Sequence, residues 1–249
     1  MDSHHWHFFE SLSFHLPFGL TKYKVLMLLA ALLVIAVFVP LAAKVRTGTA
    51  PRGRWWNFWE SFLTFVRDTI AKPNIGHDAD KYVPFLWSLF LFILTCNLFG
   101  MLPFMGSPTA NIGVTMALAG ITFCFIHGSA IAKMGFTHYL QSYVPHLDIP
   151  GLGIFIAILE IIGNCIKGVV LAIRLFANMF AGHVVLASIL MFILMVRYQG
   201  WGLFWGVTAV SVLGVIALSF LELLVAFLQA FIFTFLTAIF LGMAVHPQH

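Results

Sequence analysis

The chain has 249 residues, of which 61% are hydrophobic and only 9% are charged. Soluble domains carry about 25% charged residues, so this composition excludes an ordinary soluble fold and predicts an all-α integral membrane protein. The formal net charge of +4 comes from basic residues in short segments between apolar runs. In that position basic residues are topology signals, so we expect no nucleic-acid partner.

Three apolar runs in the first half of the chain are long enough for the ~20 residues that a bilayer crossing needs. The first covers residues 25–43, and the second and third lie within residues 83–133. Residues 1–24 precede them without a cleavage pattern typical of a signal peptide. Four basic residues and no acidic residue follow the first run at 44–54, which predicts a cytoplasmic loop and an outer N-terminus.

Residues 54–71 differ from these runs because charged residues interrupt their aromatic pattern. Trp55, Trp56, Trp59 and Phe62 recur at three- and four-residue spacing. This pattern is typical of an amphipathic helix in the membrane surface, with Trp at headgroup depth. Whether such a helix is only a lipid-facing anchor or also docks a partner stays open.

Two connections are expected to be polar. Residues 72–81 join the surface helix to the second span, and residues 134–150 form a cytoplasmic connection after the third. Pro145 and Pro150 make a long continuous helix improbable in the second of these.

Two apolar stretches of about 45 residues each fill residues 152–245. As helices they would each be about 66 Å long, against a hydrocarbon core near 30 Å. Each could fold back as two short helices, but neither contains a proline to mark a turn. We therefore favour two long, strongly tilted helices in an antiparallel hairpin. The total is five membrane-crossing helices plus the surface helix, with a cytoplasmic C-terminus.

Charges inside the first long helix are the main functional signal. Glu160, Lys167 and Arg174 follow at seven-residue steps and so share one face. Each charge costs ~2.5–3.5 kcal/mol at the bilayer centre on insertion scales, so this face cannot point at lipid. Glu160 and Lys167 are open to two interpretations, an internal ion pair or a proton path.

Arg174 has no acidic residue three or four positions away. Its guanidinium stays charged at any biological pH, whereas a buried lysine can lose its proton. A fixed positive charge in a low dielectric repels hydronium and favours ionisation of a nearby carboxylic acid. These properties suit a gate in a proton path.

Two proton-exchangeable residues lie elsewhere on the hairpin. His183 comes nine residues after Arg174 and faces away from it, while Glu222 and Gln229 share one face of the second long helix. In an antiparallel hairpin the depths of His183 and Glu222 differ by less than ~10 Å, so a water molecule could bridge them. The alternative for His183 is a packing residue.

The sequence predicts no cofactor or metal site. Cys96, Cys124 and Cys165 are scattered through apolar runs without a CxxC motif, which favours packing roles. Haem ligation needs facing histidines, and only His127 and His183 lie within spans. No nucleotide-binding or covalent-catalysis motif is present, so we expect no catalytic activity from the chain alone.

Two segments resemble a known family. Residues 174–183, RLFANMFAGH, and 228–233, LQAFIF, resemble the signature segments of the a subunit of F-type ATP synthases, and residues 97–103 and the five-span layout agree. The resemblance implies a proton-translocating stator subunit, whose hairpin faces a rotating c-ring. It implies an essential Arg174 facing the ring carboxylate, with Gln229 and Asn178 beside it. It also implies an outer half-channel at His183 and Glu222, and a cytoplasmic one at Glu160.

The resemblance further implies peripheral stalk b-type subunits, membrane lipids and protons as partners. It favours a bacterial inner membrane with a periplasmic N-terminus over the mitochondrial inner membrane. Two other functions stay open on the residues alone. One is an ion-coupled secondary transporter that uses Arg174 as an anionic-substrate site, and the other is a structural scaffold.

Overall fold

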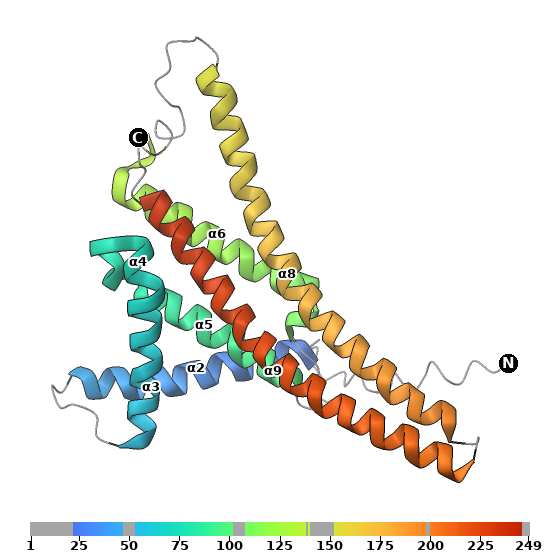
Figure 1. Ribbon diagram of the computed structural model, residues 1–249. Coiled ribbons are helices and arrows are strands. Elements are labelled where there is room, and N and C mark those ends of the chain that lie inside the picture. The colour runs from blue at the N-terminus through green and yellow to red at the C-terminus, as the bar shows by residue number, and fades with distance from the viewer. Residues whose placement is uncertain are drawn as a thin grey trace.

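The computed structural model describes residues 22–46, 53–101, 108–137, 139, 152–197 and 200–245 (Figure 1). Every regular element in these ranges is a helix. Most of the predicted segments 1–24 and 134–150 therefore lie outside the described residues, as do the side chains of Glu160 and Cys165.

The three predicted spans of the first half form helices. They are α2 (Lys22–Arg46), α5 (Ala79–Met101) and α6 (Ile112–Met134), of 25, 23 and 23 residues. Each helix is slightly longer than its apolar run, because polar residues at the ends continue the backbone hydrogen-bonding pattern. The N-terminus of α6 is capped by Asn111, whose side chain accepts a hydrogen bond from the amide of Gly113 at 2.8 Å.

The two long stretches each form one helix of 45 residues. α8 spans Leu152–Val196 and α9 spans Trp201–Val245. They lie side by side and antiparallel, and Gly200 allows the sharp reversal with a φ of 121°. The fold-back alternative is therefore wrong. Each helix is about 68 Å long at 1.5 Å per residue, roughly twice the hydrocarbon core, which favours a strong tilt.

Four helical stretches within the described residues are long and apolar enough to cross a membrane, and α2 contributes a shorter apolar segment, Lys24–Pro40. The four are Trp56–Met101, Ile112–Met134, Ile166–Val196 and Trp201–Val245. The fold class is thus confirmed as an all-α membrane protein with four to five long apolar helices.

The predicted surface helix is α3 (Arg54–Phe65), and it continues into a π-helical turn, η2 (Val66–Ala71). Its aromatic side packs on the bundle. Phe62 lies 6.0 Å from Phe90 of α5 and Phe65 lies 5.8 Å from Phe231 of α9, measured between ring centroids. This face therefore does more than contact lipid.

The polar connection predicted at 72–81 is itself largely helical. It comprises α4 (Lys72–Ile75), η3 (Gly76–Asp78) and the start of α5. Three of its charged residues, Lys72, Asp78 and Asp80, form ion pairs. Arg67 donates two hydrogen bonds to the carboxylate of Asp80, at 2.7 and 2.8 Å. Asp78 pairs with Lys133 at the end of α6.

The C-terminal half of α9 is the centre of the packing. Phe233 and Leu241 are fully buried. Gly242 lies so close to α4 that a Cβ there would overlap the carbonyl oxygen of Asn74 and lie 3.0 Å from its carbonyl carbon. A side chain at this position would therefore push α9 away from α4, whose backbone cannot yield as a flexible side chain would.

We expect Gly242→Ala to destabilise the fold by about 1–3 kcal/mol, the usual cost of overpacking. Gly214→Ala is the matched control on the same helix, because no atom lies within 4 Å of its added Cβ. Melting temperatures of the purified variants in detergent test this. Equal melting temperatures for the two variants would show that α4 moves aside freely.

Candidate functional site

Arg174 lies in the middle of α8, and its side chain is exposed. Its surface neighbours include three apolar side chains, those of Val170, Ile173 and Phe180, which are 46%, 47% and 53% exposed. The exposed polar side chain of Asn178 lies one turn along the helix. Among the ion pairs of the described residues, none involves Arg174. A permanent positive charge thus sits on an outward-facing apolar surface, where neither lipid nor a described carboxylate of its own chain neutralises it.

Asn178 and Gln229 meet across the hairpin, one turn of α8 beyond Arg174. The Nδ2 of Asn178 donates a hydrogen bond to the Oε1 of Gln229 at 2.8 Å. Gln229 is only 2% exposed, and its Nε2 has no hydrogen-bond partner among the described groups. The seven-residue spacing of Glu222 and Gln229 correctly places both on the buried face of α9.

Glu222 is buried against α8, with 8% of its surface exposed. Its carboxylate fits into the space left by Gly182. A Cβ at position 182 would come within 2.7 Å of Oε1 and 3.3 Å of Cδ. Gly182 therefore acts as a notch for the carboxylate, a role that the sequence does not reveal because it depends on which residue of α9 faces this glycine.

His183 follows Gly182, the residue against which the carboxylate of Glu222 packs. The Nε2 of His183 and the Oε1 of Glu222 are both buried without a hydrogen-bond partner among the described groups. Buried polar atoms are normally hydrogen-bonded, and exceptions in native structures point to bound water or to function. The structure thus brings two proton-exchangeable side chains, one from each long helix, to one buried place.

A polar link outside the hairpin reaches the same face of α9. Asn97 of α5 is fully buried and donates a hydrogen bond to the carbonyl of Ala226 at 3.2 Å, between Glu222 and Gln229 along the helix. Thr109 of η4 (Pro108–Ala110) donates to the Oδ1 of Asn97 at 2.8 Å. Sequence reasoning gave neither residue a role. The signals for Asn97 were an amide within an apolar run and its place in the segment 97–103, which shares in the family resemblance.

The N-terminal part of the face of α8 that carries Glu160, Lys167 and Arg174 lies partly outside the described residues. The Nζ of Lys167 lies 5.1 Å from the ring centroid of Phe240 on α9, a cation–π contact. Glu160 lies in α8, but its side chain is outside the described residues, so its pairing with Lys167 stays a prediction.

His127 lies apart from this site. Its Nδ1 shares a short hydrogen bond with the hydroxyl of Tyr139, and its ring contacts Phe123 at 4.0 Å between centroids. It therefore pairs with the segment that follows α6. Cys96, which is buried, and Cys124, which is exposed, are free thiols.

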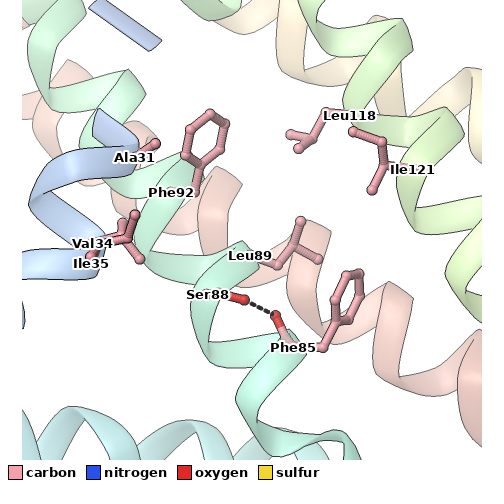
Figure 2. Close-up of a pocket in the computed structure, with 9 residues that line it drawn as sticks. All are labelled: Ala31, Val34, Ile35, Phe85, Ser88, Leu89, Phe92, Leu118 and Ile121. Carbon is pink, nitrogen blue, oxygen red and sulfur yellow. Dashed lines mark hydrogen bonds between the residues drawn. The ribbon is translucent and has the colours of Figure 1, made fainter. Parts of the chain in front are cut away.

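An apolar groove of about 270 Å³ lies between α2, α5 and α6. Figure 2 shows side chains from all three helices around it, including Val34, Phe92 and Leu118. Its one hydroxyl, that of Ser88, donates within its own helix to the carbonyls of Pro84 and Phe85, at 3.0 and 2.9 Å. Among the described residues that line the groove, all other side chains are apolar.

The notch predicts a size coupling between positions 182 and 222. Gly182→Ala should destabilise the protein by about 1–3 kcal/mol through overpacking. Glu222→Asp shortens the carboxylate arm and should recover much of that loss, giving an interaction energy of about 0.5–3 kcal/mol in a double-mutant cycle of unfolding free energies. Gly168→Ala, with no atom within 4 Å of the added Cβ, is the control. Additive effects at 182 and 222 would mean that the carboxylate moves away freely.

Comparison with known proteins extends over nearly the whole chain. The family model described as ATP synthase A chain matches residues 25–242. "ATP synthase subunit a 2" of Chlorobaculum tepidum is 40% identical over 232 residues, which cover 91% of this chain and 63% of the relative. "ATP synthase subunit a" of Myxococcus xanthus is 40% identical over 238 residues, which cover 94% of this chain and 75% of the relative.

"ATP synthase subunit a" of Chloroherpeton thalassium is 37% identical over 264 residues, which cover 100% of this chain and 76% of the relative. The chain thus spans 63% to 76% of the length of these three relatives. The family match and the identities agree with the multi-pass helical fold and with the resemblance carried by residues 174–183. The chain therefore belongs to the family of subunit a of F-type ATP synthases.

Proposed function

We propose that this chain is the proton-translocating stator subunit of an F-type ATP synthase. In this function it provides two offset half-channels and an essential arginine that exchange protons with the carboxylates of a rotating c-ring. The observation that carries the proposal is the exposed Arg174 on an apolar face, without an ion-pair partner among the described residues. Such a charge calls for a carboxylate from another subunit.

Arg174 acts as a fixed charge and never carries the proton. Its guanidinium favours the ionised form of a ring carboxylate that comes close to it. It also repels a proton that would otherwise pass directly from one half-channel to the other. The hydrogen bond between Asn178 and Gln229 supports this role, because it fixes the spacing of α8 and α9 beside the arginine.

His183 and Glu222 form the outer half-channel. Both have buried polar atoms without partners, which suits groups that bind a water molecule or a proton in turn. A proton taken up here passes to a ring carboxylate and neutralises it. The neutral carboxyl group can enter the lipid at low cost, because the penalty of burying a charge is removed. The ring is then free to turn.

Glu160 and Lys167 belong to the cytoplasmic half-channel. After a turn the ring carboxyl group approaches Arg174 from the other side, loses its proton to this path and becomes ionised again. A proton that crosses the membrane potential gains about 2.3 kcal/mol per 100 mV. Coupling this gain to rotation drives ATP synthesis in the soluble part of the complex, so the chain itself is not catalytic.

The partners that follow are the c-ring and the b-type subunits of the peripheral stalk. The basic segment at 44–54 favours a cytoplasmic loop after the first span. The N-terminus is then periplasmic and the C-terminus cytoplasmic, in a bacterial inner membrane.

Arg174→Ala is expected to abolish ATP-driven proton pumping in vesicles that carry the complex, because the fixed charge between the half-channels is lost. ATP hydrolysis by the detached soluble sector should remain. The matched control is Arg54→Ala, which removes an exposed arginine of α3 and should leave pumping intact. Unchanged pumping by the Arg174 variant would overturn the proposal, and substrate uptake by the chain alone would favour a secondary transporter.

Glu222→Gln is expected to reduce pumping to background as well, since the amide keeps the size of the side chain but cannot exchange a proton. Glu222→Asp retains a carboxylate and should keep part of the activity. Pumping is followed by quenching of a pH-sensitive dye. Equal pumping by wild type and the glutamine variant would remove Glu222 from the proton path.

A further inference from the structure

The tip of the hairpin is formed by Arg197 at the end of α8 and by the first turns of α9. In Figure 1 this tip extends beyond α2, α5 and α6. Trp201 is 81% exposed and Trp205 is 56% exposed, so the described residues leave most of the surface of these two large apolar side chains uncovered. Neither residue takes part in the proposed proton path.

The aromatic side chains of the tip form a small cluster. The ring centroids of Trp201 and Trp205 are 6.4 Å apart, and those of Phe204 and Trp205 are 5.9 Å apart. An indole has a large apolar body and one N–H donor, so it gains most where hydrocarbon and polar groups meet. For this reason Trp is enriched at the level of the lipid headgroups.

The charge of the tip points to the same partner. Arg197 is the only Lys, Arg, Asp or Glu in residues 175–221, and no acidic residue lies between Glu160 and Glu222. Residues 175–221 therefore carry one positive and no negative formal charge. A guanidinium matches the geometry of a phosphate and can form two parallel hydrogen bonds to it.

We propose that the hairpin tip binds the phospholipid headgroup layer of one leaflet, with Arg197 at the phosphates and Trp201 and Trp205 at the boundary with the acyl chains. Anionic phospholipid is preferred because of the arginine. Trp201 is 21 residues from Glu222, about 32 Å along one continuous helix. The anchored tip thus fixes how deep the buried carboxylate sits. This inference holds whichever compartment the tip faces and does not depend on the proposed proton path.

Tryptophan quenching by brominated lipids tests the depth of the tip. The complex is reconstituted into phosphatidylcholine vesicles with bromine either near the headgroup or deep in the acyl chain. The difference in fluorescence between wild type and Trp201→Phe/Trp205→Phe reports the tip alone. We expect stronger quenching by the shallow bromine. The corresponding difference for Trp87→Phe is the reference for a buried indole, since Trp87 is 2% exposed.

Two outcomes would overturn the proposal. Absence of quenching would show that protein, such as a neighbouring subunit, covers the tip, and stronger quenching by the deep bromine would place it in the hydrocarbon.

A second arm compares brominated phosphatidylglycerol with brominated phosphatidylcholine. We expect about fivefold preference for the anionic lipid near the tip in wild type, and no preference in Arg197→Gln. Equal preference in both proteins would exclude Arg197 as the phosphate ligand.

Discussion

A permanent positive charge in a medium without water is the constraint on which the rest of this structure depends. Arg174 cannot shed its proton, and hydrocarbon cannot solvate it. The chain places it on an exposed face of α8 and has to hold that face steady. α9 supplies the rigid backing for this. It is fixed to α4 through the close approach at Gly242 and to α5 through the hydrogen bond of Asn97 to the backbone of Ala226.

The two long helices differ accordingly in what they contact. The C-terminal half of α9 is buried among α4, α5 and η2, whereas most of the described side chains of α8 are exposed. Polar groups meet at the interface between α8 and α9. Asn178 contacts Gln229 there, and Glu222 packs beside Gly182. The exposed face that carries Arg174 thus belongs to α8, and α9 fixes its position in the bundle.

The positions of the helices were predictable from the sequence, because hydropathy and length are local properties. That Glu222 and Gln229 lie on one face of α9 was also predictable, from their seven-residue spacing. The single-helix form of α8 and α9 followed from the absence of proline. The Gly182 notch and the hydrogen bond from Thr109 to Asn97 were not predictable, since they depend on which helices cross at which residues. The helical turns at 72–78 were missed because one of their charged residues, Asp78, is paired by a tertiary contact with Lys133 that the sequence does not reveal.

The π-helical turn between α3 and α4 shows how such contacts depend on chain length. In η2 the amide of Lys72 donates to the carbonyl of Arg67, five residues earlier, which accommodates one residue more than an α-helical turn. Each residue rotates a helix by about 100°. Deleting one residue there would restore α-helical winding and swing the aromatic side of α3 by about a quarter turn away from α5 and α9. One residue of chain length therefore decides which way α3 faces.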